Sequence, residues 1–437
     1  MNGILIILSL FAFSVAELVR ASEQPSITYK TPARTVDTEL ARKEYQSAAD
    51  LSLSNAVKRA LSSNPYLNSA ERVLEIQEGQ LIQAGLLPNP EISSKIEEFG
   101  GTGERSGFAR SEINIEFSQL FELGGKRGKR VRSASLGRDI AALDYERARL
   151  DVILLTTQTF IKLVADHERL EIAQDTFDLA RGLSKSVRNR IHAGQVSPIE
   201  QTRADLELSS SQIRLAEAKR ILSLTKQNLA ATWGDSTPVR QTPIFTLEQF
   251  EPPKAFEIYS VQMLSSPDVI RWEREITRRE AIIALEKSRR IPDVEVTVGG
   301  SRFEEDNGKA ARVGVSVPLP LFDRNQGNIS VAQAQRHLSA NQRQEFILRL
   351  KVKLNESYTR ITSAYQNSKT LRDTVLPGAA AAHKAMVTSY QTGRVSFLEL
   401  MYAQKTLLDV REQYMATLES YHLYRAALER LIAQPMQ

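Results

Sequence analysis

The chain has 437 residues, of which 42% are hydrophobic and 25% charged, as expected for a folded protein and not for a disordered one. Its 57 basic and 52 acidic residues give a net charge of +5 and are interspersed, which is typical of solvated helix faces and argues against nucleic-acid binding. The chain has no cysteine, which excludes disulfides, thiolate metal sites and cysteine nucleophiles.

The first residues have the pattern of a secretory signal. Residues 4–15 form an apolar run, and cleavage could follow Ala16 or Ala21, although no Lys or Arg precedes the run. We therefore predict a signal peptide over 1–21 and an extended segment over 22–50. No later stretch reaches the ~18 apolar residues of a transmembrane helix, so a membrane crossing would have to use strands.

The remaining sequence contains an internal repeat. Similar strings recur about 200 residues apart and in the same order. The matched positions are Asn64-Pro65 with Ser266-Pro267, Pro88 with Pro292, Leu120-Phe121-Glu122 with Leu321-Phe322-Asp323, and Gly194 with Gly393. These matches predict a first repeat over 51–233, an equatorial segment over 234–262, and a second repeat over 263–437.

Each repeat is predicted to contain a helix, a strand pair, a very long helix, a tight turn and a last helix. In the first repeat a helix over 57–85 ends at a proline-rich stop, and strands follow at about 91–99 and 111–119. No proline interrupts 126–193, where apolar residues recur at coiled-coil spacing, so this helix would be about 100 Å long. The second repeat has strands at about 293–303 and 311–317, and a long helix from 329 with a kink or break at Pro377.

The strands alternate apolar and polar residues, as strands of a transmembrane barrel do. We expect one face to meet lipid and the other to line a lumen. The lipid-facing residues would be Ile113, Ile115, Phe117, Val313, Val315 and Val317, and the lumen residues Glu112, Glu116 and Arg312. Four strands cannot close a barrel, because even small barrels need about 8. Three chains would supply twelve, which predicts a trimer.

Candidate chemical motifs are weak. The five histidines form no helical pair, which predicts solvated helix residues and no metal site. The stretch 124–130 lacks the spacing of a phosphate loop and predicts a glycine hinge with a basic collar at the membrane edge. We find no catalytic constellation and predict no cofactor and no enzymatic activity.

The turn between the long helices is duplicated. Gly194 and Gly393 suit a left-handed helix end, and Ser197 and Ser396 are good N-caps. A carboxylate follows three residues after each serine, at Glu200 and Glu399, so both turns have the capping-box pattern. Two interpretations remain open: a helix cap alone, or a cap with a second function at a pore.

The duplicated helix–strand–strand–helix plan, covering nearly the whole chain, resembles the TolC outer-membrane efflux family. The strings 87–90, 122–127 and 318–328 resemble its heavy-metal, CzcC-like branch. The resemblance implies a mainly α fold with a small β part: a homotrimer with a twelve-stranded barrel in the bacterial outer membrane and a helical tunnel (α-barrel) in the periplasm. It implies docking to a periplasmic adaptor and an inner-membrane resistance-nodulation-division pump, and export of divalent heavy-metal cations.

The resemblance also implies site residues. A periplasmic gate would use Glu200, Tyr390, Arg394 and Glu399, while a second acidic position of the family falls on Tyr402, leaving one ring of Glu399. The hairpin tips would contact the adaptor or pump through Gly194, Val196, Ser197, Gly393, Val395 and Ser396.

Other functions stay open at this point. A duct for drugs or other small molecules is the alternative within the family. A periplasmic coiled-coil adaptor without a pore is the alternative from another class, and an enzyme is a distant third.

Overall fold

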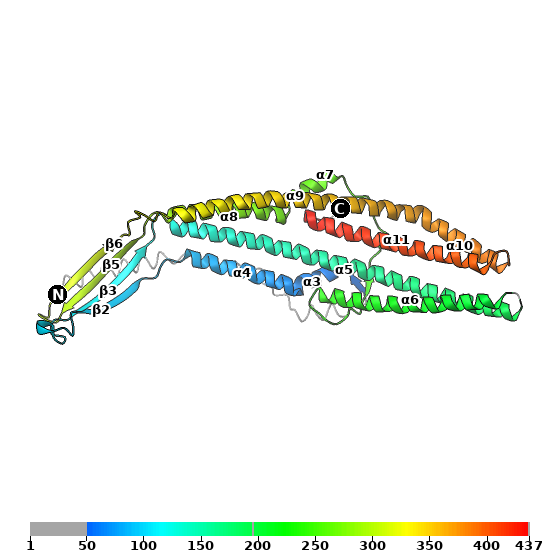
Figure 1. Ribbon diagram of the computed structural model, residues 1–437, viewed down its shortest axis with the longest axis horizontal. Helices are drawn as coiled ribbons and strands as arrows, with labels where there is room; N and C mark the ends of the chain where they lie inside the picture. Colours follow the sequence, from blue (N-terminus) through cyan, green and yellow to red (C-terminus); the bar gives the residue numbers. More distant parts are fainter. Residues whose placement is uncertain (1–49, 195, 436–437) are drawn as a thin grey trace. The chain divides into compact units, whose positions relative to one another are not determined.

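The computed structural model describes residues 50–194 and 196–435, and Asp50–Gln437 form one compact unit (Figure 1). The predicted signal peptide and almost all of the predicted segment 22–50 lie outside the described residues. The fold is mainly α with a small β part. No helix in the described part of the chain has both the length and the hydropathy of a membrane span.

The described part of the first half contains four α-helices: α3 (Leu53–Ser63), α4 (Pro65–Gly85), α5 (Lys126–His192) and α6 (Pro198–Ala231). The predicted helix over 57–85 is wrong in one respect, because it is divided at Asn64. The Asn64 side chain caps α4 by accepting from the Leu67 N–H at 3.1 Å and donates to the Thr232 carbonyl at 2.6 Å. Pro65 suits the first turn of α4, where its missing N–H is not needed.

The second half repeats this order with α7 (Phe256–Leu264), α8 (Pro267–Ser288), α9 (Gln326–Thr370), α10 (Leu376–Gln391) and α11 (Phe397–Ile432). Between α9 and α10 lies a π-helical turn, Leu371–Val375, followed by Pro377 in the first turn of α10. Since a proline cannot donate the amide hydrogen of a regular helix, the ladder widens just before it. The predicted break at Pro377 therefore takes the form of a π-turn.

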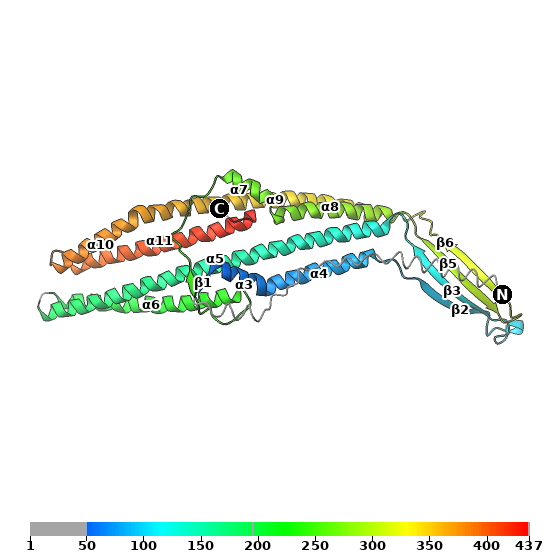
Figure 2. The same cartoon turned by 180° about the vertical axis from the view of Figure 1, so that it is seen from behind.

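The strands form one antiparallel sheet in the order β2 (Glu91–Glu97), β3 (Glu112–Phe121), β5 (Val294–Phe303) and β6 (Lys309–Ser316). The two hairpins, one from each half, join through β3 and β5, and β2 and β6 each have one partner strand. A separate pair is formed by β1 (Asp50–Ser52) and β4 (Thr242–Ile244). The four-stranded sheet continues from one end of the helices in both views (Figures 1 and 2).

The helical core is centred on α5, which packs against α4, α6, α8 and α11. Its largest cluster includes Phe160 and Leu163 of α5, Leu229 of α6 and Leu418 of α11, all fully buried. Asp268 of α8 accepts from Arg147 of α5 and from Arg430 of α11, both at 2.6 Å. Burial alone would raise the pKa of Asp268, but the bonds from the two guanidinium groups hold it below its usual range.

Candidate functional site

The helix ends farthest from the sheet form a small core of their own. Val187 of α5, Ala204 of α6, Tyr390 of α10 and Phe397 of α11 are buried together there. Gly194 and Gly393 form the turns with φ of 68° and 72°, the left-handed region that favours glycine. The two hairpins of the chain therefore meet at one tip.

Tyr390 joins the two hairpins at this tip. The residue is 5% exposed, and its hydroxyl donates to Oε2 of Glu200 on α6 at 3.3 Å. Burial and the negative charge of Glu200 raise the pKa of Tyr390, so the phenol stays a proton donor at neutral pH. The structure thus brings two of the four predicted gate residues together within one chain.

Arg190 is a third member of this contact that the sequence analysis missed. Its guanidinium carbon lies 4.6 Å from the centroid of the Tyr390 ring, and its Nη1 donates to the Tyr390 carbonyl at 3.3 Å. A cation over an aromatic face is attracted by the ring quadrupole. The one feature of the sequence that could have indicated Arg190 is its position, one helical turn before the turn residue Gly194.

The two turns differ although their sequences match. Ser396 and Glu399 form a complete capping box, in which the Ser396 N–H and hydroxyl donate to the Glu399 carboxylate at 2.7 and 2.9 Å. These bonds lower the pKa of Glu399. Ser197 makes no side-chain cap bond, and Glu200 accepts from Tyr390 instead. The expected capping box at the first turn is therefore absent.

The other predicted residues at the tip are mostly exposed. The Arg394 side chain makes no hydrogen bond or ion pair with the described residues, and only its backbone N–H bonds, to the Ser389 carbonyl at 2.9 Å. Tyr402 is 67% exposed on α11. Of the six predicted docking residues, the two valines are half-buried against the tip core; the exposed ones are Gly194, Ser197, Gly393 and Ser396.

A second cluster of predicted residues lies on the sheet. Arg312 of β6 donates to Oε1 of Glu112 and to Oε1 of Glu116, both at 3.0 Å and both on β3. The register explains the reach, because Glu116, Gly299 and Arg312 are aligned across β3, β5 and β6. Gly299 has no side chain between the two charged groups. A Cβ there would lie 2.5 Å from the Ile115 carbonyl oxygen.

The opposite face of the sheet carries the predicted apolar residues. Five of the six lie in strands on this face, and Val317 follows the end of β6. Ile115 is 58% exposed and Val313 76%. One face is thus charged and internally paired, while the other is mostly apolar, with Arg302 and Lys309 at one end, and several of its apolar side chains are exposed.

The basic residues of the stretch 124–130 partly point inward. Lys126 is buried against Asp293 at 2.7 Å, and Arg130 donates to the Ala84 carbonyl at 2.9 Å. Arg127 donates to the Gly85 carbonyl at 2.6 Å. The predicted collar is therefore in part a cap on the C-terminal carbonyls of α4.

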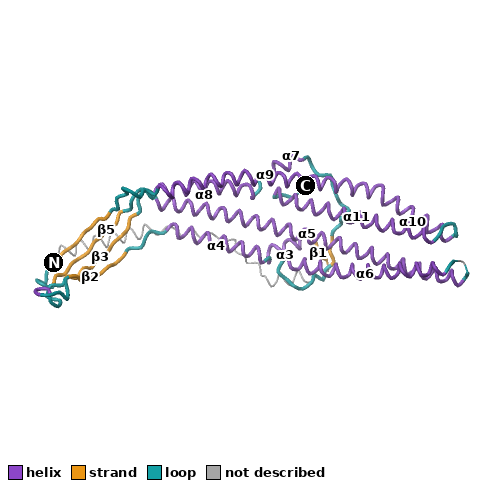
Figure 3. Tube along the Cα trace, in the orientation of Figure 1, coloured by secondary structure: helices purple, strands orange, loops and turns teal. Residues whose placement is uncertain are grey.

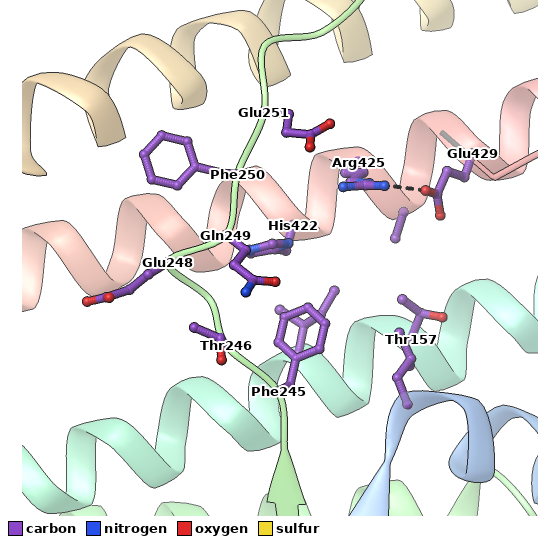
Figure 4. Close-up of a pocket in the computed structure, with 13 residues that line it drawn as sticks. Thr157, Phe245, Thr246, Glu248, Gln249, Phe250, Glu251, His422, Arg425 and Glu429 are labelled. Atoms are coloured by element: carbon purple, nitrogen blue, oxygen red, sulfur yellow. Dashed lines mark hydrogen bonds and ion pairs between the residues drawn. The ribbon is translucent and has the colours of Figure 1, made fainter. Parts of the chain in front are cut away.

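A cavity of about 820 Å³ lies beneath residues 245–251 of the equatorial segment (Figure 4). His422 of α11 is 4% exposed there, with Nε2 at 2.9 Å from the Leu247 carbonyl, so the expectation of a solvated histidine is wrong for this residue. Burial lowers its pKa, which keeps it neutral. In the part of the chain that the structure describes, no three His, Asp or Glu side chains converge as metal ligands.

Comparisons with known proteins agree with this arrangement. The family model for outer membrane efflux protein matches residues 56–235 and 259–434. The cobalt-zinc-cadmium resistance protein CzcC of Cupriavidus metallidurans is 30% identical over 393 residues, which cover 89% of this chain and 91% of that protein. The nickel and cobalt resistance protein CnrC of the same organism is 25% identical over 68% of this chain and 74% of that protein.

Solved structures share the fold at low sequence identity. The CmeC outer membrane channel of Campylobacter jejuni aligns with a TM-score of 0.72 and 18% identity, over 87% of this chain and 85% of that one. The outer membrane protein VceC of Vibrio cholerae aligns with a TM-score of 0.73 and 17% identity, over 88% and 97%. The chain therefore belongs to the outer membrane efflux protein family, in the heavy-metal branch typified by CzcC.

Proposed function

We propose that this protein is the outer-membrane duct of a three-part efflux system that exports divalent heavy-metal cations. Three copies would form a twelve-stranded barrel in the membrane and a helical tunnel in the periplasm. An adaptor and an inner-membrane pump of the resistance-nodulation-division class would dock at the hairpin tips. The observation that carries the proposal is the four-stranded sheet, which in the described part of the chain has one mostly apolar, exposed face, one charged face and two unpaired edges.

The open edges support association with further copies. Among the described residues, both β2 and β6 leave a row of backbone N–H and C=O groups without a partner strand. Such edges pair readily with other strands, and in a lipid environment every backbone polar group must be bonded. Since the edge strands β2 and β6 differ, pairing one with the other between copies is a head-to-tail contact, which builds a ring where the rotation closes and does not build a two-fold dimer.

Exposed apolar stripes on two helices also support association with further copies. On α6 every seventh residue from Ile199 to Ile213 is an exposed aliphatic one, with Leu206 66% and Ile213 70% exposed. On α9 Val331 and Leu338 are seven residues apart and Val352 follows two heptads later, with the exposed Glu345 at the heptad position between them. Heptad stripes are the seams of coiled coils. These stripes support a helical tunnel closed by neighbouring copies.

The substrate class rests on the relatives. CzcC and CnrC are named as resistance proteins for cobalt, zinc, cadmium and nickel. The internal Arg312 pairs leave the charged face of the sheet acidic, because its charged residues are two basic (Lys95 and Arg312) and five acidic (Glu91, Glu97, Glu112, Glu116 and Glu295). An acidic lumen favours the passage of cations over anions.

The gate is proposed to act at the helix tip. The Tyr390–Glu200 bond would hold the two hairpins of each chain together, and Arg394, exposed in one chain, is free to reach a neighbouring copy. Three Glu399 carboxylates would ring the entrance. A hydrogen bond to a charged group contributes about 1.5–3 kcal/mol, which an adaptor could overcome on docking.

Assembly is tested by sedimentation of the detergent-extracted protein. We expect three copies for the wild type and loss of the trimer for Leu206→Glu, because a charge would enter the α6 seam. Leu155→Glu is the control: Leu155 is similarly exposed, at 52%, but lies on the central helix α5. A wild type that sediments as a monomer would refute the proposal.

The substrate is tested by growth of a deletion strain on zinc, cobalt, cadmium and nickel salts and on a panel of drugs. We expect sensitivity to at least one of the metals, restored by the wild-type gene. Sensitivity to drugs alone would replace metal export with the drug-duct function.

A further inference from the structure

The loop that follows β4 crosses the helices as a strap, defined here as residues 245–251. It is part of the teal segment that leads to α7 in Figure 3, and Figure 4 shows it running from α5 across α11 towards α9. Its backbone is bonded to α11 at two points. The Tyr421 hydroxyl donates to the Glu251 carbonyl at 2.7 Å, and Nε2 of His422 donates to the Leu247 carbonyl at 2.9 Å. These bonds hold the strap over the cavity of about 820 Å³.

The strap also contacts the π-turn between α9 and α10. The centroid of the Phe250 ring lies 4.7 Å from the guanidinium carbon of Arg372, in the π-turn. It lies 5.8 Å from the ring centroids of Tyr365 on α9 and of Tyr421 on α11. A cation over an aromatic ring and edge-to-face rings are both favourable contacts. One short loop therefore ties α9, the π-turn and α11 together.

His422 is the side chain beneath the strap that can gain a proton near neutral pH. It is 4% exposed, and its ring packs edge-to-face with the rings of Phe245 and Tyr421, whose centroids are 5.3 and 5.1 Å away. Burial and, to a smaller degree, the positive charge of Arg425 lower the pKa of His422. A second proton would leave the bond to Leu247 intact, because a carbonyl accepts from either form of the ring. The cost of protonation is the enclosure of a cation.

The charged side chains around His422 do not remove this cost. They come from the strap, α11 and α5 and either line the cavity or lie one helical turn from His422: Glu248, Glu251, Arg425, Glu429, Glu419 and Arg169. Glu248 and Glu251 are exposed, so water and salt screen their charges. The other two carboxylates are paired with the two guanidinium groups, at 3.2 and 2.5 Å. The residues of α3 and α5 that line the cavity carry no charge.

We propose that the strap is a pH-operated clasp, which closes over neutral His422 and lifts when His422 is protonated. The closed strap binds the added proton more weakly than the open strap, in which the ring reaches water. Acidification below about 6.5, the ordinary pKa of histidine, therefore shifts the balance towards the open strap, and the strap closes again as the pH rises. Between pH 7.5 and 5.5 the ratio of open to closed strap should increase about tenfold.

An open strap would free the π-turn, because Phe250 would leave Arg372. The π-turn leads into α10, which carries Tyr390 at its far end. In the proposed duct, acidification would thus make the gate at Tyr390 easier to open. This consequence rests on the proposed function, whereas the clasp itself does not.

The experiment measures the exposure of a cysteine placed beneath the strap. The chain has no cysteine of its own, so a substitution gives one thiol per chain. Ala426→Cys places the thiol on α11 in the buried wall of the cavity. Tyr402→Cys, on an exposed position of the same helix, corrects for the effect of pH on the reagent. The full-length protein in detergent is labelled with a pyridyl disulfide at pH 7.5 and 5.5.

We expect the labelling rate of Ala426→Cys, relative to that of Tyr402→Cys, to rise about tenfold on acidification. The rise should vanish in Ala426→Cys/His422→Gln, because a glutamine amide can donate to the Leu247 carbonyl but gains no proton. It should persist with His383→Gln, since burial also lowers the pKa of His383 but this residue does not line the cavity. Thr157→Cys, on the α5 wall of the cavity, replaces Ala426→Cys if that variant does not assemble.

Labelling that does not respond to pH, or a response that persists in the His422→Gln variant, would overturn the clasp. Labelling requires no pore, so either result leaves the proposed duct standing, and a monomer in sedimentation would refute the duct and leave the clasp. In planar bilayers the open probability should rise between pH 7.5 and 5.5 for the wild type and not for His422→Gln. If labelling responds and the open probability does not, the strap does not control α10.

Discussion

Tyr390 has a buried hydroxyl, and such a group needs a hydrogen-bond partner. Glu200 provides it at 3.3 Å, and Arg190 lies on the other side against the ring at 4.6 Å. The sequence could indicate Tyr390 and Glu200 through the family resemblance, but not Arg190. The partner of a long, flexible side chain is decided by how two hairpins meet, and sequence spacing does not contain that information.

At this scale we predict that Tyr390→Phe opens the proposed channel. The substitution removes one charge-assisted bond per chain, a loss of about 1.5–3 kcal/mol, while the ring stays stacked on Arg190. Planar-bilayer recordings should therefore show a higher open probability, and Tyr390→Phe/Arg190→Gln a higher one still, because the stacked cation is lost as well. Tyr402→Phe is the control, since its side chain is 67% exposed. Wild-type conductance in the double variant would rule out a latch at Tyr390.

Among the elements, the strands and the long helices could be predicted best. Apolar residues at every second position indicate a strand, and apolar residues that recur every seven positions indicate a long helix. The division of the first helix at Asn64 is indicated in the sequence by Pro65, because a proline is suited to the first turn of a new helix. The π-turn before Pro377 could be foreseen as a break but not as a π-turn. Leu371, the first residue of this turn, is buried in the largest core cluster, and the spacing of residues in the sequence does not contain such packing.

For the sheet we predict unequal effects of alanine at two adjacent glycines. In Gly299→Ala the new Cβ would lie 2.5 Å from the Ile115 carbonyl oxygen and 2.9 Å from Cγ of Glu116, so β3 and β5 must separate. Overpacking of this kind costs about 1–3 kcal/mol. In Gly300→Ala the nearest atom is at 3.6 Å, which is an ordinary contact. The measurement is the fraction of the protein that still migrates as the assembled form on a gel after heating. This fraction should fall for Gly299→Ala and stay near the wild-type value for Gly300→Ala. Equal losses in the two variants would contradict the pairing of β3 with β5.

At the scale of the whole molecule, the sequence repeat predicted the order of elements, and the open sheet edges agree with the need for more copies. The sequence does not predict how the copies pair, because the pairing depends on which strands lie at the edges of the folded sheet. The same limit applies to the entrance: one chain shows the Glu399 carboxylate bonded to its own Ser396, and a ring arises only when several copies meet.

We predict that Glu399→Gln lowers the cation selectivity of the assembled channel without unfolding it. Glutamine also serves in a capping box, so α11 should keep its N-terminus. The hydrogen bonds from Ser396 hold the pKa of Glu399 below its usual range, opposing the increase that three approaching carboxylates would cause. The carboxylates should therefore stay charged at neutral pH, and the reversal potential in a salt gradient should shift towards zero in the variant. An unchanged reversal potential would place the selectivity elsewhere, for example at Glu112 and Glu116.

The unequal use of the two serine–glutamate turns has a consequence for any protein that surrounds the tip. A trimer of this chain would present six hairpins of alternating kind: three whose glutamate is engaged by a tyrosine, and three whose glutamate closes its own helix. Two similar repeats in each of three chains would give the tip approximate six-fold symmetry, and the difference between the two turns reduces it to three-fold symmetry. Six identical partner chains around the tip would occupy two chemically distinct environments, and their occupancy should follow two dissociation constants instead of one.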